Sequence, residues 1–227
     1  MSVFRLTDTL VFPDPLHADP DGLLAVGGDL SPERLLLAYR LGIFPWYSSA
    51  TPILWWSPDP RLVLYPNELK VSKSLSRVLK KGRFRITADC AFAQVIRECG
   101  AVRREKREDT WLVPAMITAY RDLHQLGFAH SIEAWRDDHL VGGLYGIALG
   151  RVYFGESMFS RETDASKVAL VHLVQHLSRQ GCQLIDCQVS TRHLQSLGAR
   201  EIPRREFLQR LRAAMDPGDQ RRGRWQL

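Results

Sequence analysis

The sequence predicts a mixed α/β protein in which a smaller N-terminal α+β domain precedes a larger domain built on a mixed sheet. Residues 1–105 and 106–227 are the expected domains. Within the second, a helical pattern over 164–180 separates the last two of four strand-like runs. That order predicts a parallel pair of strands joined by a helical crossover. The four runs cover residues 129–135, 140–149, 152–159 and 183–189.

Helix signals mark out the N-terminal domain. A helix should begin after Ser31 and reach Leu41, because serine is a favoured N-cap and proline suits the first helical position. A second helix should begin after Ser72 and end at Gly82. Asp89 is the expected N-cap of a third. The apolar face of that third helix would consist of Phe92, Val95, Ile96 and Cys99.

Further helices and turns divide the second domain. A helix is expected over 112–126, with Met116, Ile117, Tyr120 and Leu123 facing inward. Asp137-Asp138 and Gly150-Arg151 are typical of hairpin turns. A last helix should begin at Pro203.

Composition limits the class of protein. The 227 residues are 45% hydrophobic and 25% charged, which is typical of a soluble globular protein. No apolar run is long enough to cross a bilayer, and the N-terminus lacks a secretory signal, so we expect a cytoplasmic protein with no membrane partner. Four cysteines without a Cys-x-x-Cys pair predict neither a metal site nor a disulfide framework.

Positive charge is concentrated on one predicted helix. The net charge of +6 favours an anionic partner, although weakly. Residues 71–85 hold six basic side chains and no acidic one. This face is either a solvated surface suited to a helix C-terminus or a phosphate-binding surface, and the absence of acids favours the second. The residues that share the face are Lys73, Arg77, Lys80 and Lys81.

Two apolar, strand-like runs, residues 152–161 and 184–189, are interrupted by polar side chains: Glu156 in the first and Asp186 and Gln188 in the second. Alternation along a strand would place Asp186 and Gln188 on one face. Burying a carboxylate is costly unless it is paired. The pattern therefore indicates either a functional site or satisfied structural carboxylates.

The order of motifs along the chain resembles that of the bacterial leucyl/phenylalanyl-tRNA–protein transferases. The resemblance spans roughly residues 10–215, too much for coincidence. It is carried by Gly22–Ser31, Gly42–Trp46, Trp55–Arg61, His130–Glu133, Gly142–Gly146, Gly155–Arg161, Asp186–Gln188, Ser196–Ala199 and Ile202–Arg204.

The resemblance implies a reaction and its partners. Leucine or phenylalanine, and less well methionine, would move from Leu-tRNA or Phe-tRNA to the α-amine of a protein beginning with Arg or Lys. The product would carry a new peptide bond and be marked for degradation. An aminoacyl ester is already activated, so no cofactor and no metal is expected. We expect a monomer, with a GNAT-like fold in the second domain as in the family.

The resemblance also implies roles for residues. Asp186 and Gln188 match the catalytic pair: Gln188 would contact the attacking amine and Asp186 would orient Gln188 and accept the proton's charge, with Asp186 itself or a water as the final proton acceptor. Glu156 would bind or position the acceptor amine, or instead pair structurally with Arg161 or Lys167. Leu144, Phe154, Met158 and Leu170 are candidates for the apolar aminoacyl pocket, and equally for plain core. Trp46 and Trp111 match tryptophans that stack on the terminal adenosine. Lys73, Arg77, Lys80 and Lys81 match the cluster for the tRNA backbone.

Two other functions fit parts of the sequence. A GNAT-type N-acetyltransferase would use acetyl-CoA, but the loop at 160–166 has no glycine and carries two acids, which disfavours pyrophosphate binding there. A non-catalytic tRNA-binding module would not need the intact pair of Asp186 and Gln188.

Overall fold

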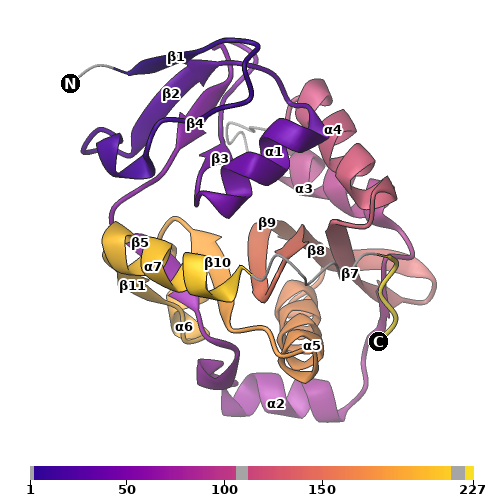
Figure 1. The fold of residues 1–227 in the computed structure, drawn as a ribbon. Helices are drawn as coiled ribbons and strands as arrows, with labels where there is room; N and C mark the ends of the chain where they lie inside the picture. Colours follow the sequence, from indigo (N-terminus) through magenta and orange to yellow (C-terminus); the bar gives the residue numbers. More distant parts are fainter. Residues whose placement is uncertain (1–2, 106–111, 216–222) are drawn as a thin grey trace.

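Two β-sheets organise the residues that the computed structural model describes, 3–105, 112–215 and 223–227 (Figure 1). The smaller sheet has the strand order β1-β2-β4-β3 and comes from the N-terminal part of the chain. Its strands are β1 (Phe4–Leu6), β2 (Leu23–Gly27), β3 (Phe44–Pro45) and β4 (Leu54–Trp56).

The larger sheet is mixed, as predicted, and has seven strands in the order β11-β5-β10-β9-β8-β7-β6. Strands β7, β8 and β9 are antiparallel, whereas β10 runs parallel to β9 after the helix α5 (Ala165–Arg179). This is the strand–helix–strand order on which the GNAT-like prediction depends. The strands are β5 (Arg61–Leu64), β6 (Arg85–Ala88), β7 (Ala129–Arg136), β8 (His139–Leu149), β9 (Val152–Ser160), β10 (Leu184–Gln188) and β11 (Arg200–Ile202).

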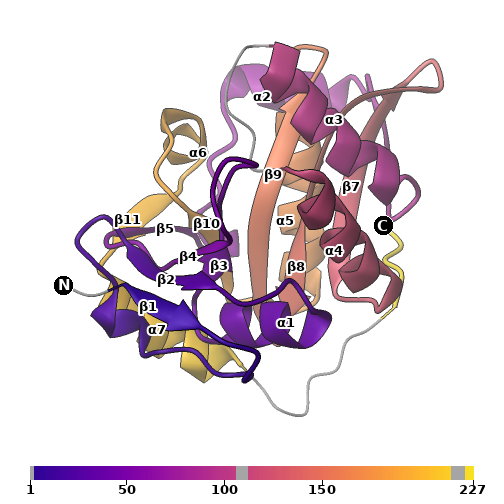
Figure 2. The ribbon, with the colours of Figure 1, turned by 90° about the horizontal axis from the view of Figure 1, so that it is seen from above.

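Helices cover both faces of this sheet. One apolar cluster packs α5 against one face, and a second packs α3 (Phe92–Glu105) and α4 (Pro114–Gln125) against the other (Figures 1 and 2). The second cluster also takes in α1 (Pro32–Arg40) and α7 (Arg204–Ala214), so it joins the two sheets. The remaining helices are α2 (Lys73–Lys80), α6 (Arg192–Ser196), and the short 3₁₀ turns η1 (Pro15–His17) and η2 (Pro66–Glu68).

Two predicted caps are confirmed and one is wrong. The hydroxyls of Ser31 and Ser72 accept hydrogen bonds from the third residue beyond them, which are N-cap contacts at α1 and α2. Asp89 caps no helix. Its backbone is left-handed, with φ of 54°, and its carboxylate accepts hydrogen bonds from the neighbouring strand β7 and from the C-terminal segment.

The division between the sheets falls earlier in the sequence than residue 105. Strands β5 and β6 precede that residue and pair within the larger sheet, β5 with β10 and β6 with β7. The boundary between domains at residues 105 and 106 rests on local sequence signals, which do not reveal these long-range strand pairings, and it stays a prediction. Among the described residues, none of the helices combines the length and apolarity needed to span a bilayer.

Candidate active site

A cavity of about 390 Å³ opens where β9 and β10 separate. The two strands are paired only from Val152 to Phe154 on β9 and from Leu184 to Asp186 on β10. Beyond that point side chains from β8, α5 and the loop after β3 close the space. Its volume falls within the range of small-molecule sites.

Two interruptions of strand register place the polar residues of this cavity. On β9 the pairing with β8 steps from Gly155 to Ser157, which leaves Glu156 as the extra residue of a bulge. On β10 the pairing with β5 steps from Asp186 to Gln188, and Gln188 has a φ of 63°. Glu156 and Gln188 both line the cavity. Bulges re-aim side chains in this way next to active sites.

Glu156 is the centre of a buried hydrogen-bond network. Its Oε1 accepts bonds from the Tyr39 hydroxyl at 2.8 Å and from Gln188 Nε2 at 2.9 Å, and its Oε2 accepts one from the Tyr120 hydroxyl at 2.8 Å. The two tyrosine oxygens are 2.5 Å apart. Burial raises the pKa of Glu156 from its ordinary 4.5 to about 7, although these hydrogen bonds oppose the rise.

Asp186 is buried behind the cavity wall and is paired with a cation. Arg61 on β5 donates from Nε to Oδ1 at 2.8 Å and from Nη2 to Oδ2 at 2.7 Å, and neither side chain is exposed to solvent. The guanidinium carbon lies 4.8 Å from the centre of the Phe44 ring and 4.6 Å from that of Phe207. Asp186 does not line the cavity. Its Oδ1 instead accepts the backbone N–H of Gln188 at 2.9 Å.

The expected pairing of Asp186 with Gln188 is thus present in a different form. Regular alternation does not hold between them, because the bulge inserts Cys187 as an extra residue. The aspartate holds the backbone of Gln188, and the amide of Gln188 reaches Glu156 across the cavity. The structure therefore brings Glu156, Asp186 and Gln188 together, with Asp186 behind the cavity wall rather than on it.

Three of the four expected apolar residues line the cavity: Leu144, Met158 and Leu170. Phe154 does not; it is fully buried and packs against the ring of Tyr39 at 5.1 Å. Further apolar lining comes from Leu173, Ile185 and Leu194, which the sequence pattern did not single out.

Trp46 lies at the cavity with 44% of its surface exposed, and its ring tilts against Trp56 at 5.9 Å. A ring in that position is available to a ligand. Trp111 lies outside the described residues. Trp55, in contrast, is fully buried core.

Arg61, Tyr39 and Tyr120 were not predicted as site residues. The signal for Tyr120 was present, because it falls on the inward face of a predicted helix, where a tyrosine hydroxyl needs a partner. Arg61 ends one of the motifs that carry the family resemblance, but nothing local shows that it is buried. His193 also lines the cavity, and its Nε2 is buried without a hydrogen-bond partner in the described structure.

The three basic residues Lys73, Arg77 and Lys80 of α2 and its C-cap Lys81 are all exposed, while Leu75 on the opposite side of the helix is buried and α2 contacts α5. In the described part of the chain, no acidic side chain pairs with Lys73, Arg77, Lys80 or Lys81. The surface therefore keeps its positive charge available to an anionic partner.

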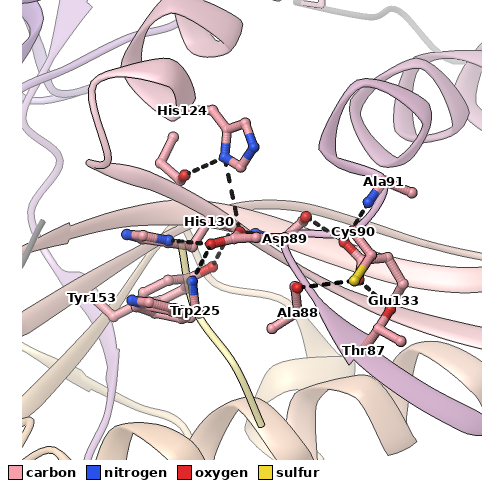
Figure 3. Close-up of polar contacts among 12 residues, drawn as sticks. Thr87, Ala88, Asp89, Cys90, Ala91, His124, His130, Glu133, Tyr153 and Trp225 are labelled. Atoms are coloured by element: carbon pink, nitrogen blue, oxygen red, sulfur yellow. Dashed lines mark hydrogen bonds and ion pairs between the residues drawn. The ribbon is translucent and has the colours of Figure 1, made fainter. Parts of the chain in front are cut away.

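The motif His130–Glu133 makes structural contacts between neighbouring strands and the C-terminal segment (Figure 3). Asp89 lies 2.8 Å from His130 Nδ1 and accepts the backbone N–H of Trp225 at 2.7 Å, while the Trp225 ring stacks on that of His130 at 3.9 Å. Glu133 accepts bonds from the Thr87 hydroxyl and from the backbone of Ala91. These contacts join β6, β7 and the C-terminal segment.

Comparison with known proteins places the whole chain in one group. The family profile described as leucyl/phenylalanyl-tRNA protein transferase matches residues 63–212, and the profile of that family's N-terminal domain matches residues 28–59. A leucyl/phenylalanyl-tRNA–protein transferase of Syntrophobacter fumaroxidans is 69% identical over 208 residues, which cover 92% of this chain and 89% of that protein. One from Anaeromyxobacter sp. (strain Fw109-5) is 60% identical over 227 residues, covering 100% and 96%.

Solved structures give a more distant likeness. A GCN5-related N-acetyltransferase from Kribbella flavida matches with a TM-score of 0.41 and 12% identity, covering 76% of this chain and 61% of that one. The structure of L-PGS from Bacillus licheniformis matches with a TM-score of 0.42 and 9% identity, covering 74% and 54%.

Proposed function

The chain belongs to the leucyl/phenylalanyl-tRNA–protein transferase family, and from this premise we propose that it moves leucine or phenylalanine from an aminoacyl-tRNA to the N-terminal amine of proteins that begin with Arg or Lys. The new N-terminal residue would mark those proteins for degradation. The observation that carries the proposal is the cavity, which has apolar walls and a polar end formed by Glu156 and Gln188.

The reaction needs no activation beyond the ester already present. The amine nitrogen attacks the ester carbonyl carbon, the ribose oxygen leaves, and a peptide bond replaces the ester. The protein must orient the amine, take up its proton and stabilise the developing oxyanion. We assign Gln188 to orient the amine, because its side chain lies at the cavity wall. Asp186 and Arg61 are positioning residues that act through the backbone of Gln188.

The apolar walls suit the side chain that is transferred. Leu144, Met158 and Leu170 come from three different elements and enclose the space from several sides. The unbranched side chain of Met158 can adapt to ligands of different shape, which fits a site that accepts both leucine and phenylalanine.

The RNA would lie over Trp46 and α2. Trp46 offers an exposed ring at the cavity for the terminal adenosine, and α2 with its C-cap Lys81 offers four exposed cations for backbone phosphates. The double variant Lys80→Ala/Lys81→Ala should raise KM for aminoacyl-tRNA and lower the slope of log K against log[salt] by about 1 for each phosphate that is no longer neutralised. An unchanged slope would remove α2 from the RNA interface.

The decisive experiment mixes the purified protein with tRNA charged with labelled leucine and a peptide that begins with Arg. A matched peptide beginning with Ala and an Asp186→Ala variant serve as controls. Label on the Arg peptide, and little on either control, supports the transferase and its acceptor rule. Lack of transfer, with acetyl-CoA consumed when it is offered instead, would favour an acetyltransferase. Binding of the charged tRNA without transfer would favour a non-catalytic module.

A further inference from the structure

We propose that Glu156 accepts the proton that the acceptor amine loses as the peptide bond forms, and that Tyr39 and Tyr120 are positioning residues that hold the carboxyl group in both of its protonation states. The inference rests on the proposed transferase function and assigns one chemical step of it. In the buried network around Glu156, the number of protons differs from the number of close oxygen–oxygen contacts unless the carboxyl group is protonated.

Three groups in this network are in mutual contact. The oxygen–oxygen distances are 2.5 Å between Tyr39 and Tyr120, 2.8 Å between Tyr39 and Glu156, and 2.8 Å between Tyr120 and Glu156. Three hydrogen bonds require three protons. Burial raises the pKa of both tyrosines, so each keeps its single proton. The two hydroxyls can therefore fill only two of the three contacts.

The third proton has to come from the carboxyl group. When Glu156 is ionised, both hydroxyls donate to it and no proton lies between the two tyrosine oxygens. When Glu156 is protonated, it donates to Tyr120, Tyr120 donates to Tyr39, and Tyr39 donates back to Oε1, which closes the ring. The carboxyl group is hydrogen-bonded to both hydroxyls in either state, and its protonation also places a proton between the two tyrosine oxygens, which favours uptake of a proton at Glu156.

Glu156 can also reach the amine. A carboxylate has about four acceptor positions, and the structure fills three of them with Tyr39, Tyr120 and Gln188. Glu156 lines the cavity, as does Gln188, which donates to it through Nε2 and so directs its own Oε1 elsewhere. An amine that donates one N–H to Gln188 Oε1 would lie beside Glu156.

The other buried carboxylate is unsuited to this step. Asp186 is separated from the cavity and both of its oxygens are held by Arg61. The groups around Glu156 are Tyr39 from α1, Tyr120 from α4, Tyr145 from β8, Tyr153 from β9, and Asp186 and Gln188 from β10, with Arg103 of α3 on the same cavity. Burial and the charge of Asp186 raise the pKa of Glu156 to about 7. A base with a pKa near neutral pH is suited to take the proton that the amine nitrogen loses as it bonds to carbon.

The step balances. The nitrogen forms a bond to the carbonyl carbon and gives one proton to Glu156. The bond between that carbon and the ribose oxygen breaks, and the ribose oxygen takes a proton back from the Glu156 carboxyl group. Glu156 is thereby ready for the next cycle, and no oxidant, reductant or further reactant is consumed.

The first test compares single-turnover transfer by the wild type, Glu156→Gln and Glu206→Gln, with both substrates saturating. Glu206 is a 39% exposed glutamate of α7 and is the matched control. We expect the rate to fall by about 10²–10⁴-fold in Glu156→Gln and to stay unchanged in the control. In Glu156→Ala, added formate should restore part of the rate, and a stronger base such as acetate should restore more. Equal rates in the wild type and Glu156→Gln would overturn the inference.

Infrared spectroscopy tests the proton without relying on turnover. The wild type should show a carboxyl C=O band that titrates near neutral pH and is missing from Glu156→Gln. Tyr120→Phe removes a donor to the charged form, so this midpoint should move to higher pH, and the acid limb of the transfer rate with it. A titrating band that persists in Glu156→Gln would refute the assignment. Failure of the wild type to transfer at all would instead count against the proposed function.

Discussion

The pair formed by Arg61 and Asp186 allows the sharpest test of how the site is held together. Both side chains are completely buried and joined by two hydrogen bonds, at 2.8 and 2.7 Å. The variant Asp186→Asn keeps the shape of the side chain but leaves the guanidinium without a counter-charge. Breaking a buried pair by removing one partner costs about 3–5 kcal/mol. Two aromatic rings, Phe44 and Phe207, lie against the guanidinium, and neither supplies a counter-charge for it.

The assay is urea denaturation of four proteins: the wild type, Asp186→Asn, Arg61→Met and the double variant. Each single variant should lose about 3–5 kcal/mol of unfolding free energy. The double variant leaves no isolated charge, so its loss should be smaller than the sum of the two by about 2 kcal/mol or more. Additive losses, or a loss under 1 kcal/mol in Asp186→Asn, would show that the pair does not bind in the way described.

The same variants separate positioning from chemistry. Asp186 touches the backbone N–H of Gln188 and not the cavity. Single-turnover transfer at saturating substrate should therefore slow in Asp186→Asn but keep an acid limb, whose midpoint moves to lower pH because the variant removes a charge that raises the pKa of Glu156. If Asp186 accepted the proton directly, the acid limb of that profile would disappear.

Three further perturbations test other parts of the structure. The pKa of Glu156 in the folded protein is raised from its ordinary 4.5 to about 7, so its contribution to stability is complete below pH 4.5 and is lost as pH rises through about 7. Glu156→Gln lacks this loss, so between pH 5 and pH 8 its free energy of unfolding should rise by up to about 3 kcal/mol relative to that of the wild type, as measured by urea denaturation. Trp225→Ala should cost about 3 kcal/mol of unfolding free energy, since the ring is 8% exposed, whereas Leu227→Ala, at 46% exposed, should change it by less than about 0.5 kcal/mol. Leu144→Phe fills part of the cavity and should lower transfer of phenylalanine more than that of leucine when the two charged tRNAs compete; an equal loss would place Leu144 outside the pocket.

The helices and strands were predictable where local signals act alone. Ser31 and Ser72 cap their helices because the capping contact spans three residues, and the paired aspartates at 137 and 138 both have positive φ, as the hairpin they join requires. Asp89 shows the limit. It has the residue type of an N-cap, but its partners come from β7 and from residue 225, which no local pattern can reveal.

In the candidate site, too, local signals could be predicted from the sequence and long-range contacts could not. Glu156 and Gln188 could be found because polar residues in apolar strands are unusual, but their direction could not, because each is set by a bulge that depends on the partner strand. Tyr39 and Tyr120 are 81 residues apart and occupy ordinary inward positions on their helices. Only the packing of α1 beside α4 brings their hydroxyls together. Arginine is almost never fully buried unless paired, so Arg61 gave no reason to look inside the fold.

The site contains two carboxylates with opposite surroundings, and these surroundings explain why one supports and the other reacts. Asp186 is balanced by a permanent cation, so its charge is compensated within the protein and it can hold the backbone of Gln188 throughout the reaction. Glu156 is bound in the described structure by neutral donors, two hydroxyls and an amide, which stabilise its charge only in part against burial. A group in that position takes up a proton near neutral pH. The transfer of an amino acid to an amine requires this property at the cavity wall, and Glu156 has both the position and the surroundings to supply it.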